Sequence, residues 1–307
     1  MSGPSPRAFV LSGGASLGAI QVGMLRALYE RGITPDLIVA TSAGAINGAF
    51  IASRPQTVET ADELAGLWRR VRRGTVFPLN PVSGLLGFLG SRAYLVPRSG
   101  LRRLVAEHVE RELLEELPLP LHVVAVDVVT GEELLLSRGP LVEAVLASAA
   151  IPAVFPPIEW GDRELMDGGV ANNTPISHAI ALGAREVYVL PAGHACALER
   201  SPSSALGMAL HALTLLTHSR LIADIELHVA QAKLVVLPPP CPLAIAPVDF
   251  SHSGELIDRA AEGAAAFLDG GGAERPPIRM AMHRHQPARP GSPRKGAASL
   301  LSPRPER

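Results

Sequence analysis

The chain has 307 residues, 47% of them hydrophobic, and its acids and bases nearly balance to a formal net charge of −1. This size suits one large domain with a substantial core. The balance of charge leaves no global field that would attract nucleic acid, so we expect no nucleic-acid partner.

Two strand–turn–helix units open the chain. Residues 8–11 are an apolar strand, and apolar side chains then recur at helical spacing after a glycine-rich turn. The second unit follows directly, with a strand over 37–40, a turn over 41–44 and a small-residue helix over 45–52. Strands that alternate with helices in this way favour an α/β fold on a mainly parallel sheet.

The first turn contains Gly13, Gly14 and Gly18. It fits a dinucleotide-binding loop poorly, because Ala15 occupies a glycine position and Asp36 precedes the next strand, whereas the ribose-binding acid should end it. A Walker loop fits no better, since no Gly-Lys-Ser/Thr follows. Backbone amides unobstructed by side chains converge here at the positive end of a helix, which suits a small anion or a transient oxyanion.

The second turn presents a serine. Ser42 lies where the strand passes sharply into the helix, and the small residues Ala40 and Gly44 stand two positions to either side. This pattern is typical of a nucleophile elbow, although Ala40 replaces the usual glycine and its methyl group should crowd the turn slightly. Ser42 is therefore a candidate nucleophile, and the alternative is an ordinary helix N-cap serine.

Residues 74–98 interrupt the alternation of strands and helices. They are rich in Gly, Pro and large apolar groups without a clean period. Such a segment is typical of a mobile lid or of a loop that touches a membrane, and the alternative is a packed irregular connection.

The alternation then resumes. The predicted elements are a strand over 121–129 that turns at Thr130-Gly131 into residues 132–137, a helix from Pro140 through Ala149, and two helix–strand pairs, 175–184 with 185–192 and 203–232 with 233–240. Residues 205–216 are the most apolar later stretch, too short to span a bilayer, and we expect them to form a buried helix.

An aspartate stands between these elements at a second glycine-rich position. Asp167 follows a short apolar run and precedes Gly168-Gly169. The two glycines allow backbone to pass close by while the carboxylate points into a cleft. Alone, an Asp-Gly pair would predict only a hairpin turn.

The end of the chain and the cysteines carry few functional signals. Residues 270–307 are basic and rich in Gly, Pro, Ser and Arg, which predicts a disordered tail after a domain over 1–269. Cys196 and Cys241 are too few for a disulfide framework and too far apart for a zinc site, so we expect buried thiols and no metal. The beginning of the sequence carries no secretory signal, which predicts a cytoplasmic protein with at most peripheral membrane contact.

Several of these motifs together resemble the patatin-like phospholipase family, lipid acyl hydrolases that use a Ser-Asp dyad. The resemblance covers about residues 7–190. The matching elements, in family order, are Gly13-Gly14-Ala15-Ser16-Leu17-Gly18, Ala40-Thr41-Ser42-Ala43-Gly44, Ala147 to Phe155 with Pro156-Pro157, Asp167-Gly168-Gly169, and Asn172-Asn173-Thr174-Pro175.

The resemblance implies a three-layer patatin-like fold, related to the α/β-hydrolase theme, with acyl lipids or esters as substrates and no cofactor. By the same resemblance Ser42 is the nucleophile and Asp167 its base. The amides of Gly13, Gly14 and Ala15 would form the oxyanion hole. The residues that support these motifs are Gly18, Ala40, Ala43, Gly44, Gly168 and Gly169. Alanine replaces a usual glycine at position 15, and a positive φ there would cost on the order of 1 kcal/mol.

A dyad needs an unusual aspartate, since an exposed carboxylate is a weak base at neutral pH. We therefore expect burial beside apolar groups such as Met166, Val154 and Phe155 to raise the pKa of Asp167. In this scheme the apolar residues around Leu85 to Leu95 would cover the acyl site.

A Ser-His-Asp triad is the main rival, but no histidine has the glycine-flanked placement of Asp167. Four histidines fall in predicted helices and one in a loop, namely His178, His211, His218, His228 and His194. Two other functions stay open: a non-catalytic lipid-binding or regulatory module on the same fold, and a nucleotide-binding protein.

Overall fold

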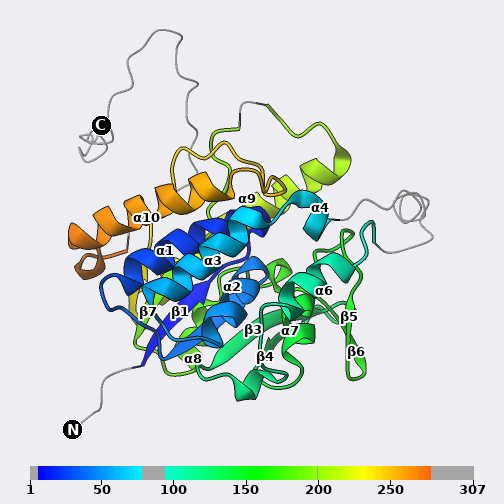
Figure 1. Cartoon of the computed structure of the whole chain (residues 1–307), viewed down its shortest axis with the longest axis horizontal. Coiled ribbons are helices and arrows are strands. Elements are labelled where there is room, and N and C mark those ends of the chain that lie inside the picture. Colours follow the sequence, from blue (N-terminus) through cyan, green and yellow to red (C-terminus); the bar gives the residue numbers. More distant parts are fainter. Residues whose placement is uncertain (1–5, 78–93, 199, 278–307) are drawn as a thin grey trace.

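A mainly parallel sheet forms the centre of the computed structural model, which describes residues 6–77, 94–198 and 200–277 (Figure 1). The strands are β1 (Arg7–Leu11), β2 (Leu37–Thr41), β3 (Leu121–Asp127), β4 (Glu133–Leu136), β5 (Ile158–Trp160), β6 (Arg163–Asp167), β7 (Glu186–Leu190) and β8 (Lys233–Val236). Followed from one hydrogen-bonded neighbour to the next, the strands form the path β5-β6-β3-β2-β1-β7-β8, and β4 also pairs with β3. The pairs among β3, β2, β1, β7 and β8 are parallel, whereas β4, β5 and β6 join by antiparallel pairs.

Helices cover both faces of this sheet. The longer helices are α1 (Ala19–Tyr29), α2 (Ala43–Ala52), α3 (Val58–Arg70), α6 (Ser99–Ala106), α7 (Leu141–Ser148), α8 (Ile176–Ala181), α9 (Ala205–His228) and α10 (Ser253–Asp269). The short ones are α4 (Arg73–Val76) and the 3-10 turns η1 (Ala15–Gly18), η2 (Leu114–Glu116), η3 (Gly168–Val170) and η4 (Gly272–Glu274). Within the described ranges, no helix combines the length and apolarity needed to cross a membrane.

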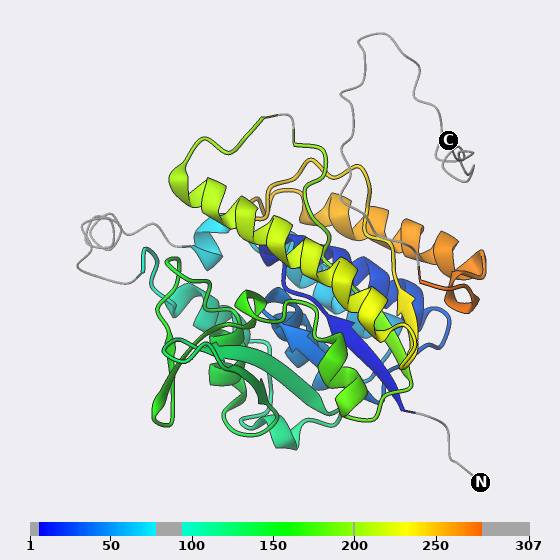
Figure 2. The ribbon, with the colours of Figure 1, turned by 180° about the vertical axis from the view of Figure 1, so that it is seen from behind.

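Alternating side chains of the strands divide the core in two. Phe9 and Leu11 point to the face covered by α1, α2, α3, α7 and α10, and Ala8 and Val10 point to the face covered by α8 and α9. Figure 2 shows α9 crossing that second face. Parallel strands buried on both faces are expected to be mainly apolar, as β1 is after Arg7 and β2 is before Thr41. The predicted fold class, a three-layer α/β structure, is thereby confirmed.

The register around β3 brings two strand ends together. β2 ends with Thr41 opposite Val124, and β6 ends with Asp167 opposite Ala125, the next residue along β3. β4 already occupies the other edge of β3 at Val124 and Ala125, so β2 and β6 share one edge. They run toward each other, because β2 is parallel and β6 antiparallel to β3. Thr41 and Asp167 therefore meet head to head, about one residue rise of ~3.3 Å apart along β3, and Ser42 directly follows Thr41.

Most of the predicted elements are confirmed, including both strand–turn–helix units and the hairpin of β3 and β4. Asp127 closes that hairpin by accepting the amides of Val129 and Thr130, and Gly131 takes a positive φ of 71°. Helices α3, α6 and α10 were not predicted. α10 packs closely on α1, where a Cβ on Gly23 would lie 2.1 Å from the Ile257 carbonyl oxygen.

Two predictions about burial are wrong. Residues 205–216 do form a helix, but it is partly or fully exposed, because this half of α9 extends beyond the sheet. The thiols are not buried either: Cys241 is exposed, and its Sγ lies 3.9 Å from the partly buried Sγ of Cys196. The loops that follow the neighbouring strands β7 and β8 bring these two residues together.

Two further predictions concern segments that the structure describes only in part. Of the irregular segment 74–98, residues 78–93 lie outside the described residues, and so does most of the predicted tail, residues 278–307. Residues 270–277, which we assigned to the tail, include the turn η4, where a Cβ on Gly272 would lie 2.4 Å from the Phe267 ring. The described part therefore continues past the predicted domain boundary at 269.

Candidate active site

Ser42 occupies a strained turn between β2 and α2. Its backbone has φ 55° and ψ −121°, a conformation that side-chain-bearing residues rarely adopt. The helix can follow so closely because a Cβ on Gly44 would lie 2.3 Å from the Leu11 carbonyl oxygen, which leaves room only for glycine. Although Ser42 is at the N-cap position, its side chain makes no capping hydrogen bond. The ordinary N-cap role does not apply.

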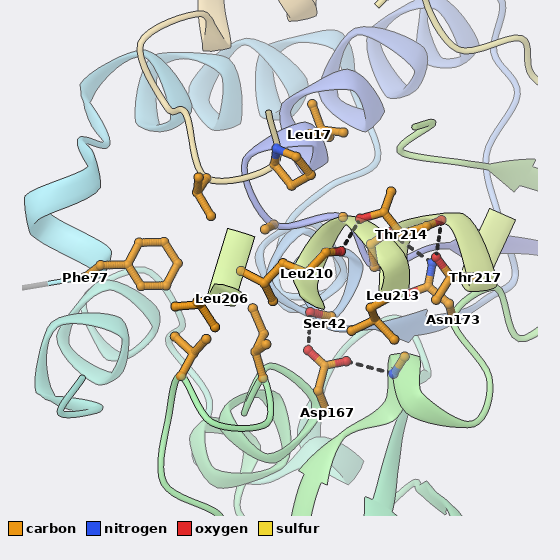
Figure 3. A pocket seen from close by; sticks show the side chains of 18 of the residues that line it. Leu17, Ser42, Phe77, Asp167, Asn173, Leu206, Leu210, Leu213, Thr214 and Thr217 are labelled. Atoms are coloured by element: carbon orange, nitrogen blue, oxygen red, sulfur yellow. Dashed lines mark hydrogen bonds between the residues drawn. The ribbon is translucent and has the colours of Figure 1, made fainter. Parts of the chain in front are cut away.

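The Ser42 hydroxyl instead donates to Asp167. The distance from Oγ to Oδ2 is 2.6 Å, and both residues are only 6% exposed. Asp167 Oδ1 accepts the amide of Gly169 at 2.7 Å, which fixes the carboxylate plane (Figure 3). A Cβ on Gly168 would lie 2.3 Å from the Val124 carbonyl oxygen, so glycine is needed where the chain leaves β6.

Burial changes the acidity of this carboxylate. Desolvation raises the pKa of Asp167 from 3.8 to about 6, against the opposing effects of the hydrogen bonds from Ser42 and Gly169. The direction is the one predicted from the sequence. Val154, one of the apolar neighbours expected to cause it, lines the same cavity as Asp167, and Phe155 lines the adjoining one.

The glycine turn lies beside this pair, but one of its three predicted donors is already used. The Gly13 amide donates to the Asn173 carbonyl at 3.1 Å, which corrects its assignment to the oxyanion hole. Within the described residues, the amides of Gly14 and Ala15 have no hydrogen-bond partner, and both residues line the cavity with Ser42. Ala15 has a φ of 50°, the positive value for which we expected strain.

A buried polar network fixes the glycine turn. Gln21 Nε2 donates to the carbonyls of Ser12 and Leu190, at 2.7 and 3.0 Å. Gln21 Oε1 accepts from Asn47, and Asn47 accepts from the Trp68 indole at 2.8 Å. The network joins α1, α2 and α3 to the ends of β1 and β7, so that the free amides are held in place before any ligand arrives. Sequence analysis did not identify it, although Gln21 and Asn47 stand out in apolar helices.

Two more residues complete the site and were also missed. The Ser148 hydroxyl accepts the Ser42 amide at 2.8 Å, which holds the elbow from the side of α7. Asn173 donates from its side chain to the Gly13 carbonyl at 3.2 Å, in addition to accepting the Gly13 amide. Both residues lie in segments near Asp167 that resemble the family. This resemblance is the sequence feature that could have marked them as site residues.

An apolar cavity of about 500 Å³ opens over these groups (Figure 3). Its polar end holds Ser42, Asp167 and the free amides, and its wall includes the α9 side chains Leu206, Leu210 and Leu213. A smaller space of about 50 Å³ adjoins it and shares Ser42 as a lining residue. The arrangement places a serine hydroxyl, hydrogen-bonded to a buried carboxylate, beside two unpartnered backbone amides at one end of a mainly apolar cavity.

No histidine is among the residues that line either space. Of the five histidines weighed for a triad, His178 lies on α8, His194 in the loop after β7, and the other three on α9. In the part of the chain that the structure describes, no group of three or more His, Cys, Asp or Glu side chains is placed to hold a metal ion.

Fold and site together define an α/β protein with a serine at a strand-to-helix elbow and an aspartate at the facing strand end. Its sequence matches the profile of patatin-like phospholipases over residues 9–180. The chain belongs to the patatin-like phospholipase family.

The chain is also similar to individual proteins along part of its length. An uncharacterized NTE family protein of Mycobacterium tuberculosis strain H37Rv is 33% identical over 175 residues, covering 56% of this chain and 45% of the relative. Patatin-like phospholipase domain-containing protein 7 of Rattus norvegicus is 29% identical over 195 residues, which are 61% of this chain and 13% of the relative. This chain thus spans less than half of either relative. The crystal structure of VipD from Legionella pneumophila aligns with a TM-score of 0.49 at 14% identity, covering 89% of this chain and 67% of that one.

Proposed function

We propose that this protein is a serine esterase that hydrolyses acyl lipids, with Ser42 as nucleophile and Asp167 as general base. The observation that carries the proposal is the 2.6 Å hydrogen bond from Ser42 Oγ to a buried carboxylate at the polar end of an apolar cavity. Family membership supports lipid acyl hydrolysis in general, and the two-residue mechanism is inferred from this geometry.

The chemistry follows in two halves. As Ser42 Oγ attacks the ester carbonyl, Asp167 accepts its proton, and the amides of Gly14 and Ala15 stabilise the oxyanion. The alcohol leaves with the proton from Asp167 and an acyl-enzyme remains. Water then attacks the acyl-enzyme while Asp167 accepts a proton from it. Asp167 returns this proton to Ser42 Oγ as the acyl–oxygen bond breaks, which releases the carboxylic acid and restores both side chains. Since the pKa of Asp167 is about 6, the carboxylate is mostly ionised at neutral pH and is still a stronger base than an exposed aspartate.

A soluble chromogenic ester such as 4-nitrophenyl butyrate tests the proposal. We expect Ser42→Ala and Asp167→Asn each to lower kcat by about a thousandfold or more, because dyad members act as a unit. Ser219→Ala is the matched control, since Ser219 is exposed on α9. Single replacement of each histidine should preserve the rate.

A fluorophosphonate provides a second readout. It should attach to Ser42 in the wild type and not in Ser42→Ala, as detected by mass spectrometry. Equal esterase rates in wild type and Ser42→Ala would overturn the proposal. Lipid binding without turnover or labelling would instead indicate a non-catalytic module on this fold.

A further inference from the structure

Seven arginines are concentrated beside the cavity. All are exposed, and they lie at the end of α3, in or directly before α4, and in or directly before α6: Arg69, Arg70, Arg72, Arg73, Arg98, Arg102 and Arg103. We call them the arginine patch. No acidic residue occurs in residues 69–77 or 94–106, although the whole chain has a net charge of −1. The patch is thus a local positive field on a nearly neutral protein.

Most of this charge is not neutralised by the fold. Arg69 pairs with Asp258, and Arg102 pairs with Glu143. The other five arginines form no ion pair with any described residue. The Asp249 pKa is lowered mainly by the hydrogen bond from Ser251, and the charge of Arg73 contributes in the same direction. Five exposed guanidinium groups thus carry a charge that no described carboxylate pairs, although the Arg72 group donates to the Arg69 and Val71 carbonyls.

An apolar surface lies on the other side of the cavity. The outer face of α9 in its first half consists of exposed apolar residues: Ala205, Met208, Ala209, Ala212 and Leu216. Met208 is 46% exposed and Leu216 is 68% exposed. The first charged residue of α9 is Arg220. We call these five residues the α9 outer face. The inner face of the same half-helix lines the cavity.

Both surfaces border the same cavity. Arg73 is exposed and lines it, so the cavity reaches the surface beside the arginine patch. Leu206, near the start of α9, lines it too. In Figure 1, α4 appears between the first half of α9 and α6, and α4 contacts α6. Cationic side chains and an exposed apolar helix therefore flank one opening.

The geometry points to an anionic lipid surface as the partner of the arginine patch and the α9 outer face. Arginines bind acidic head groups, while apolar side chains enter the boundary between head groups and acyl chains. A nucleic acid would use the arginines but would gain nothing from exposed Met208 and Leu216. Docking in this orientation would bring the cavity opening to the lipid. The inference concerns binding and does not depend on the proposed hydrolysis.

Vesicle sedimentation of the full chain tests this inference, with Ser42→Ala as the background so that lipid is not consumed. We expect binding to phosphatidylcholine vesicles that contain phosphatidylglycerol, much weaker binding to pure phosphatidylcholine, and loss of binding as salt screens the charges. Replacing Arg70, Arg98 and Arg103 by Gln should lower the partition coefficient by about a hundredfold. None of these three arginines lines the cavity, so the same changes in the Ser42-containing chain should preserve hydrolysis of a soluble ester.

The matched control replaces Arg111, Arg138 and Arg185 by Gln. These arginines are also exposed and have no ion pair with the described residues, but they lie outside the arginine patch. The net charge changes equally, and any contribution of the basic C-terminal residues is the same in both variants. We expect the control to keep most of its binding to anionic vesicles.

The role of the α9 outer face is tested by a matched pair of variants on the same helix. Leu216→Glu should weaken vesicle binding at least tenfold, because it places a charge in the proposed lipid contact. Leu227→Glu should not, since Leu227 is 63% exposed but lies in the second half of the helix. The inference is wrong if neutral and anionic vesicles bind equally, if both arginine triples lose binding equally, or if Leu216→Glu binds like Leu227→Glu. Competition by single-stranded RNA with no effect of Leu216→Glu would instead indicate a nucleic-acid surface.

Discussion

Asp167 combines two properties that usually conflict, since it is buried and yet must ionise to act as a base. Catalysis in the proposed mechanism needs the carboxylate, and its pKa is about 6. We expect kcat/KM for a soluble ester to rise with pH through a midpoint near 6 and then level off. A pH-rate profile of the free enzyme measures this. A midpoint near 4, or one that disappears when a histidine is replaced, would contradict the assignment of Asp167 as base.

The same burial should destabilise the folded protein. The pKa of Asp167 is 3.8 when exposed and about 6 in the fold, so the folded state binds the proton more tightly. Stability is thus lost as pH rises between these values, by about 3 kcal/mol in all. We expect Asp167→Asn, which carries no charge, to be inactive but more stable than wild type at pH 7. Thermal melts at pH 4 and pH 7 check this, because the gain should nearly disappear at pH 4.

The sequence identified most of the residues of the candidate site but could not place their hydrogen bonds. Ser42, Asp167 and the glycine turn were found because glycine and strained-turn patterns are local. The assignment of the Gly13 amide failed because its partner, Asn173, is 160 residues away in the sequence. The roles of Ser148 and Gln21 were missed for the same reason, since a buried serine or glutamine gives no local sign of the backbone group that it contacts.

At the scale of elements, the close contact between the end of β1 and the start of α2 requires glycine at position 44. A Cβ on Gly44 would lie 2.3 Å from the Leu11 carbonyl oxygen, which is backbone and cannot move aside. We expect Gly44→Ala to destabilise the fold by about 2 kcal/mol or more and to lower esterase activity by displacing the elbow.

Gly66 on α3 is the matched control. The nearest atom to a Cβ there would be the end of the flexible Arg70 side chain, at 3.5 Å. Gly66→Ala should therefore be neutral or stabilising by up to about 1 kcal/mol. Chemical denaturation of both variants measures the difference. Equal stabilities would show that the contact at Gly44 can relax.

Helix α9 should control which acyl chains fit. Leu210 lines the cavity, so Leu210→Trp fills space that a long chain would need. We expect the ratio of activity on a 4-nitrophenyl palmitate to that on the acetate to fall about tenfold, with the acetate rate nearly unchanged. Leu227→Trp, on an exposed part of α9, is the control. An unchanged ratio would place the acyl chain elsewhere.

Helices and strands were predicted well where a local pattern of apolar residues determines them. They were predicted less well where contacts with distant segments determine their position or burial. The strands β1, β2 and β7 each contain a run of four apolar residues, which the sequence shows directly. The first half of α9 has the same apolar composition as a buried helix, so its sequence could not reveal that it lies beyond the sheet. Helix α10 joins the core through its contacts with α1 and α3, which are distant from it in the sequence.

At the scale of the whole molecule, the chemistry and the cavity wall come from different parts of the chain. Ser42, Asp167 and the glycine turn all lie within residues 9–180, the part that matches the family. Helix α9, whose inner face lines the cavity, follows that part. The family match therefore covers the proposed reacting groups, whereas the helix that we expect to set chain-length preference lies outside it.

The meeting of β2 and β6 on one edge of β3 has a mechanical consequence. Thr41, the residue before Ser42, and Asp167 are paired with successive residues of β3, so a twist of the sheet moves both backbone positions together. A motion of the backbone that separated these two positions would have to detach β2 or β6 from β3, and it would disrupt the sheet itself.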